Sequence, residues 1–255
     1  IMVGDWSSDV CSSDLGLARV LHGDLDDGVE WALQAMAEAE ARLDLGEVQA
    51  HAYVAALGLT FAGRLDDLEA LLGPVLALRG ATMLWEHYQI GLLGLASLAA
   101  GWRGQPEYAW ALAVQAEAIG RRPGLFPGMT HGITPIRGLP RDGLEAAAGR
   151  LWRAVEDYLS RGCIAAGVAL GITAVEAQPD PRRAAVVAEH ARRTQSPLLR
   201  AFGEYIAATG TGDPDELKRC IDDLWERGAR LHAVKAAVSR SLALRAAERT
   251  ADAVA

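Results

Sequence analysis

Few of the residues that could carry out chemistry stand close enough in this sequence to act together. Asp24, Asp26 and Asp27 would suit part of a calcium-binding loop, but the glycine and the distal glutamate that such a loop needs are missing. These aspartates stand where a helix is expected to begin. We therefore interpret them as residues that cap and stabilise its first turn.

The remaining chemically capable side chains are equally isolated. The six histidines are dispersed, and none stands within one helix turn of another histidine or of a cysteine. The glycine signatures of nucleotide-binding loops do not occur. No serine stands in the glycine-flanked elbow of a hydrolase or near a base. We predict no catalytic residue, no cofactor, no metal and no enzymatic activity.

Four residues are candidate contacts for a small-molecule effector or a protein partner. Trp85, His87 and Tyr88 place aromatic side chains beside a polar one, which suits a binding pocket. His131 is the fourth, in a stretch rich in glycine and proline. Trp85, Tyr88 and the apolar run after them also fit the ordinary packing of a helix. We consider packing the better interpretation.

Composition limits the classes of function. Of the 255 residues 51% are hydrophobic, enough to bury a large core, and the net charge is −8. An acidic surface has few cations with which to grip a nucleic-acid backbone. The longest apolar runs, Ile90–Ala100 and Cys163–Val175, are too short to span a bilayer. Cys163 and Cys220 have no partner at a useful spacing, so we expect a reducing, cytoplasmic environment.

Turn signals recur along the chain at intervals of 33 to 41 residues, beginning with Gly23-Asp24 and ending with Gly212-Asp213. Periods of this size are typical of helix–turn–helix repeats. A second break inside each interval predicts two helices per period, and no strand-like alternation occurs. The sequence thus predicts an all-α fold of TPR-like antiparallel hairpins stacked as a solenoid. The expected helices span 24–43, 47–62, 65–79, 83–101, 105–120, 141–161, 163–178, 180–195, 197–209, 213–227 and 229–249.

Two segments interrupt the repeats. Asp5–Leu15 matches the translation of a common sequencing adapter, and it lacks the apolar region of a signal peptide. We therefore interpret residues 1–15 as an artefactual, disordered segment, with the true gene cut near Gly16. Residues 121–143 form a Gly/Pro-rich junction between repeats at 16–120 and at 144–255. This junction is either an effector-binding gate or a degraded repeat, and we favour the degraded repeat.

The end of the chain carries the clearest helix signals. Asp213, Pro214 and Glu216 are a helix cap, a first-turn proline and a capping acid, and Gly228 marks a stop. The apolar stripe that includes Trp225 is expected to be buried against the following helix. That helix presents large apolar residues at helical spacing, namely Leu231, Val234, Val238 and Leu242.

Three segments of this region carry a family resemblance: Gly212–Leu217, Trp225–Leu231 and Ala233–Ala237. They resemble the end of the helical-repeat region of LuxR-type, MalT-like bacterial transcriptional regulators. The resemblance implies a sensor or interaction arm between a nucleotide-binding module and a helix-turn-helix. It implies an intact protein that binds DNA and is switched by an effector or a protein partner. The motifs of the two other modules have no matching positions here.

The alternative is a free-standing helical adaptor that binds a protein or peptide. In either case we expect no membrane association and no DNA binding by this segment. The one basic concentration has the composition of a solvated helix face paired with acids. It comprises Arg182, Arg183, Arg192, Arg193 and Arg200.

Overall fold

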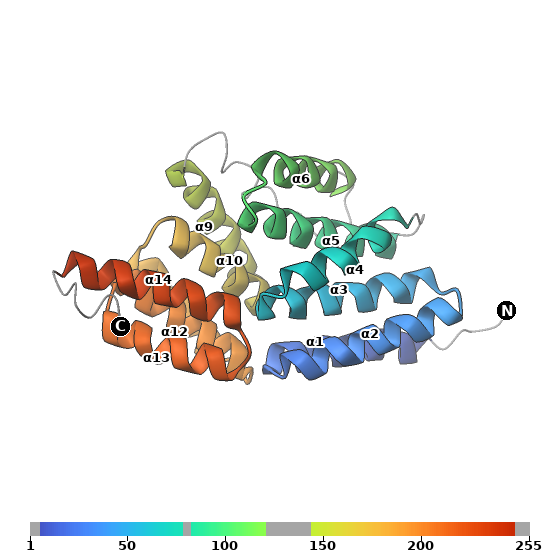
Figure 1. The fold of residues 1–255 in the computed structure, drawn as a ribbon, viewed down its shortest axis with the longest axis horizontal. Helices are drawn as coiled ribbons and strands as arrows, with labels where there is room; N and C mark the ends of the chain where they lie inside the picture. Colours follow the sequence, from blue (N-terminus) through green and yellow to red (C-terminus); the bar gives the residue numbers. More distant parts are fainter. Residues whose placement is uncertain (1–5, 79–82, 121–143, 248–255) are drawn as a thin grey trace. The chain divides into compact units, whose positions relative to one another are not determined.

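The computed structural model describes residues 6–78, 83–120 and 144–247, and these residues form α-helices joined by short turns, with no strand among them (Figure 1). The predicted all-α class is confirmed. The chain divides into two compact units, residues 1–137 and 138–255. The division falls inside the predicted junction 121–143, which lies outside the described residues, as does His131.

In the first unit every described helix packs against its neighbours in the sequence. Its helices are α1 (Trp6–His22), α2 (Leu25–Ala41), α3 (Leu45–Ala62), α4 (Leu65–Ala77), α5 (Met83–Trp102) and α6 (Pro106–Gly120). The third helix contacts α1, α2, α4 and α5, and α6 packs on α5. α3 and α5 are therefore the central helices of this unit.

The second unit repeats this pattern. Its helices are α9 (Leu144–Ser160), α10 (Ile164–Ala177), α11 (Pro181–Arg192), α12 (Pro197–Thr211), α13 (Pro214–Glu226) and α14 (Arg230–Ala246). α12 is the central helix and contacts α10, α11, α13 and α14. Apart from α1, the described helices lie within about three residues of the predicted bounds, the precision expected at helix ends.

The predicted start signal works at α13 but not fully at α2, where Asp24 occupies the N-cap position and its side chain makes no capping hydrogen bond. The Asp213 carboxylate accepts hydrogen bonds from the backbone N–H groups of Asp215 and Glu216, at 2.8 and 3.1 Å, and Pro214 opens α13. Gly212 ends α12 with a φ of 70°, a left-handed conformation that glycine adopts without steric cost. The two hydrogen bonds that its carboxylate accepts hold the pKa of Asp213 below its usual value.

Glycines on the central helices let neighbouring helices approach closely. A Cβ atom added to Gly58 of α3 would lie 2.5 Å from Cγ2 of Val29 on α2. One added to Gly203 of α12 would lie 2.6 Å from the Cβ of Ala191 on α11. Both distances are far below van der Waals contact. The helix pairs therefore pack at a separation that only glycine permits.

The start of the chain differs from the prediction. Residues 6–15 belong to helix α1, whereas no organised structure was expected before Gly16. Ser13 is buried and is joined to Tyr88 of α5 by a hydrogen bond. Val20, further along the same helix, is fully buried, so packing of its second half supports the turns that precede it. The origin of the segment as translated adapter stays a prediction.

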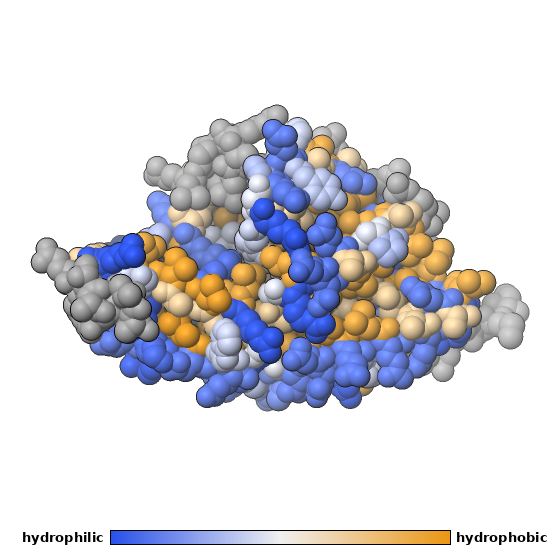
Figure 2. Space-filling model, in the orientation of Figure 1, coloured by the Kyte–Doolittle hydropathy of each residue, from blue (hydrophilic) through white to orange (hydrophobic). Residues whose placement is uncertain are grey.

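The packing of the last helix also differs from the prediction. Trp225 was expected to be buried, and 58% of it is exposed. The face of α14 that packs inward carries Ala233, Ala236, His232 and Leu244, and it follows the buried Ala229 at the N-cap. The opposite face, here named the outer ridge, consists of Val234, Val238 and Leu242, which are 54%, 56% and 61% exposed. The alanines of the inward face allow a closer approach between helices than the large side chains of the outer ridge would. Apolar residues gather over α14 in the space-filling view (Figure 2).

Candidate functional site

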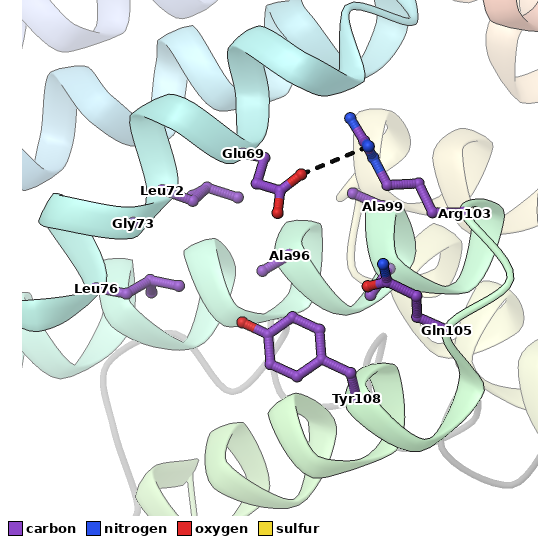
Figure 3. A pocket seen from close by; sticks show the side chains of 10 residues that line it. Glu69, Leu72, Gly73, Leu76, Ala96, Ala99, Arg103, Gln105 and Tyr108 are labelled. Carbon is purple, nitrogen blue, oxygen red and sulfur yellow. Dashed lines mark ion pairs between the residues drawn. The ribbon is translucent and has the colours of Figure 1, made fainter.

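A pocket in the first unit lies among α4, α5 and α6 (Figure 3). Leu72 and Leu76 of α4 form one wall, and Ala96 and Ala99 of α5 form the floor. The ring of Tyr108, near the start of α6, projects over that floor and is 57% exposed. The cavity has a volume of about 230 Å³. It is a mostly apolar hollow that is open to solvent.

Charged side chains stand at the rim of this pocket. The guanidinium of Arg103, at the end of α5, lies 3.5 Å from a carboxylate oxygen of Glu69 on α4. It also forms an ion pair with Asp66. The side chains of Glu69 and Asp66 are 69% and 95% exposed, and that of Arg103 is 30% exposed. Two carboxylates share one guanidinium, so the rim keeps an excess of negative charge.

The sequence creates the pocket through residues that leave space. Gly73 has no neighbouring atom within 4 Å of the position where a Cβ would lie. The alanines of α5 leave room where larger residues would fill the gap. The hydroxyl of Ser97 donates a 2.7 Å hydrogen bond to the carbonyl of Ala109 and fixes α6 against α5. Gly104 has a φ of 72° in the turn between them, which places Tyr108 over the floor.

A buried pair of amides supports the wall from behind. The Nε2 of Gln49 on α3 donates to the Oε1 of Gln89 on α5 at 3.0 Å, and both residues are fully buried. Gln89 in turn donates to the carbonyl of Leu76 at 3.4 Å. This chain of contacts ties α3, α5 and the end of α4 together. It holds Leu76 in the position where it lines the pocket.

His87 and Tyr88, two of the residues proposed as contacts from the sequence, are not among the residues that line this pocket. His87 and Tyr88 are half-buried neighbours on α5 with ring centroids 5.7 Å apart. The ring centroid of Tyr88 lies 6.0 Å from that of Tyr53 on α3. Burial lowers the pKa of His87, and burial together with Tyr88 raises the pKa of Tyr53 to about 12. This environment is typical of packing. The side chain of Trp85 lies outside the described residues.

Sequence reasoning missed Glu69, Arg103 and Tyr108. The available signal was the turn Gly104-Gln105-Pro106, which places an arginine and a tyrosine on either side of a helix break. Nothing in a single sequence indicates that Glu69, on an earlier helix, faces this turn. The pocket is therefore a property of the packing between helices.

The described ranges contain no group of three or more histidine, cysteine, aspartate or glutamate side chains placed to hold a metal ion. Within the same ranges, no helix has the length and apolar character needed to cross a membrane. Cys163 and Cys220 are free thiols, and burial, followed by the effect of nearby acids, raises the pKa of Cys220 to about 12.

We compared the chain with protein-family models, curated proteins and solved structures, and none of them matches.

Proposed function

We propose that this chain is the TPR-like sensor or interaction arm of a LuxR-type, MalT-like transcriptional regulator. The observation that carries the proposal is the local structure of the segments that resemble that family. Gly212–Leu217 begins α13, Trp225–Leu231 spans the turn into α14, and Ala233–Ala237 lies within α14. This is the order of one helix, a glycine turn and an alanine-rich helix.

The packing within each unit supports a stacked, TPR-like array. Every described helix contacts its neighbours in the sequence, and the central helices also contact the next but one. Such nearest-neighbour packing is typical of helical repeats. The outer ridge of α14 offers an exposed apolar surface to a protein partner or to another part of the regulator.

The arm acts by binding a protein partner or a small-molecule effector, in the cytoplasm, without catalysis or a cofactor. DNA contact belongs to another module of the intact regulator. The pairing of the arginine cluster supports this division: Arg192 and Arg193 both bind the carboxylate of Glu189, at 2.8 and 3.1 Å. The guanidinium of Arg183 lies over the ring of Trp152 at 5.4 Å.

Sequencing the intact gene from an uncontaminated genome tests the proposal. The regulator assignment predicts a nucleotide-binding P-loop encoded upstream and a helix-turn-helix encoded downstream in the same reading frame. A gene that encodes neither module would contradict it and would favour the free-standing adaptor. The free thiols of Cys163 and Cys220 fit a reducing compartment in both cases.

A further inference from the structure

We infer that the pocket among α4, α5 and α6 binds a peptide segment of a protein partner in which an apolar side chain is followed by lysine or arginine. The inference rests on the proposed interaction role and adds the chemistry of the ligand. It follows from three properties of the pocket: its size, its charge and its aromatic wall.

The size of the pocket fits one side chain. Its volume is about 230 Å³. Sites for drug-sized small molecules and cofactors occupy roughly 300–1,000 Å³. A cavity below that range, with Leu72, Leu76 and Ala96 along its surface, fits a leucine or phenylalanine side chain. The remainder of the ligand then extends over the rim, as it does when a peptide is bound.

The charge of the rim selects a cation. Asp66 and Glu69 both face the single guanidinium of Arg103, and both carboxylates are largely exposed. A cationic group on the ligand can form an ion pair with the second carboxylate. An acidic ligand has to displace Asp66 or Glu69 from Arg103 before it can form one. The chain as a whole has a net charge of −8, so basic ligands are also favoured at long range.

Tyr108 provides the third property. Its ring is more than half exposed and projects over the pocket (Figure 3). A cation within about 6 Å of an aromatic ring is attracted to the ring face. A basic residue that follows the buried apolar side chain lies between this ring and the carboxylate of Glu69. The pocket therefore binds an apolar side chain and an adjacent cationic side chain.

Fluorescence anisotropy with the full 255-residue chain tests the inference. The probes are three labelled octapeptides of glycine and serine with a central Leu-Arg, Leu-Glu or Ser-Arg pair. We expect the Leu-Arg peptide to bind at least about tenfold more tightly than the Ser-Arg peptide, because only the first buries a large apolar side chain. Its affinity falls as salt is raised. Equal binding of the three peptides contradicts the inference.

Substitutions of residues that line the pocket test whether the peptide binds there. Ala96→Leu fills the floor and lowers the affinity at least roughly tenfold, while Ala185→Leu, on an exposed part of α11, leaves it unchanged. Glu69→Gln weakens binding by up to about fivefold, as expected for an exposed charge pair. Glu226→Gln, an exposed acid of α13, is its control. Tyr108→Ala, at a largely exposed position, also weakens binding and keeps the test decisive if Ala96→Leu does not fold.

The outcomes separate this inference from the proposed function. Full affinity in Ala96→Leu, Glu69→Gln and Tyr108→Ala contradicts the pocket assignment, even where the gene encodes the regulator modules. Free arginine amide that competes as well as the Leu-Arg peptide contradicts a peptide ligand and reassigns the pocket to a small molecule. Pocket-dependent binding in a chain whose gene lacks those modules supports the inference and contradicts only the regulator assignment.

Discussion

Lys235 of α14 donates a hydrogen bond to Glu176 of α10, with 2.8 Å between its Nζ and the carboxylate Oε2. Each of the two side chains is 22% exposed. The hydroxyl of Tyr205, on the intervening α12, donates to the other carboxylate oxygen at 3.0 Å. Burial, and secondly the nearby carboxylate, raise the pKa of Tyr205, so the hydroxyl stays protonated. One carboxylate thus links three helices of the second unit.

A double-mutant cycle on Lys235→Met and Glu176→Gln measures this link. We expect the two changes to couple by about 1 kcal/mol in the free energy of unfolding, because the pair is mostly removed from water. Urea unfolding of the parent, both single variants and the double variant provides the cycle. Additive effects of the two changes would show that the pair contributes nothing beyond its separate residues.

The exposure of Trp225 predicts a small effect of its removal. Trp225→Ala should lower the free energy of unfolding by no more than about 0.5 kcal/mol, as is usual at surface positions. Phe202→Ala, at a fully buried ring of α12, should cost about 3–5 kcal/mol. Chemical denaturation of both variants provides the comparison. A loss at Trp225 as large as that at Phe202 would restore the prediction made from the sequence.

The described part of the fold was largely predictable because its signals are local. Caps such as Asp213 and stops such as Gly212 act within a few residues, so they can be recognised in one sequence. The orientation of α14 was not predictable in the same way. Val234, Val238 and Leu242 form one face, and Ala233, Ala236 and Leu244 form the opposite one, and periodicity alone does not indicate which face packs. The face that packs carries the alanines, which let the helices approach closely.

The pocket was not predictable for a related reason. Glu69 and Arg103 belong to different helices, and their ion pair depends on how α4 packs on α5. The aromatic candidates around His87 were chosen by residue type, and the structure shows His87 and Tyr88 as half-buried packing residues. Chemical type alone does not distinguish a packed aromatic from one that lines a pocket.

Buried His51 predicts a loss of stability in mild acid. It is 2% exposed, and burial, followed by the charge of Arg42, lowers its pKa below the model-peptide value of 6.5. The unfolded chain therefore binds this proton more readily than the folded chain does. The free energy of unfolding is therefore unaffected by His51 above about pH 6.5, and it falls as the pH drops from there toward the pKa of His51 in the folded chain.

Urea unfolding at several pH values between 8 and 5 provides the measurement. His51→Gln should flatten this dependence on pH relative to the parent chain. An unaltered slope in His51→Gln would show that His51 does not cause the acid sensitivity.

Two helical glycines should respond in opposite ways to alanine, because only Gly203 lies where two helices, α11 and α12, approach closely. Gly203→Ala should be destabilising, because its Cβ would meet Ala191 at 2.6 Å and the backbone of Ala188 at 3.3 Å. Gly149→Ala, on α9, meets nothing within 4 Å and should stabilise the chain by roughly 0.5–1 kcal/mol. Melting temperatures of the two variants test this. Equal tolerance of alanine at both sites would contradict the tight packing.

The central claim is that this chain is an interaction arm that leaves DNA contact to another module. A titration of the full chain against labelled promoter duplexes at near-physiological salt tests it most directly. The account predicts no specific binding and at most feeble association at low salt, because the acidic surface releases few counterions. Submicromolar binding that is abolished by Arg182→Glu combined with Arg193→Glu would contradict it, since the DNA contact would then lie in the helical array itself.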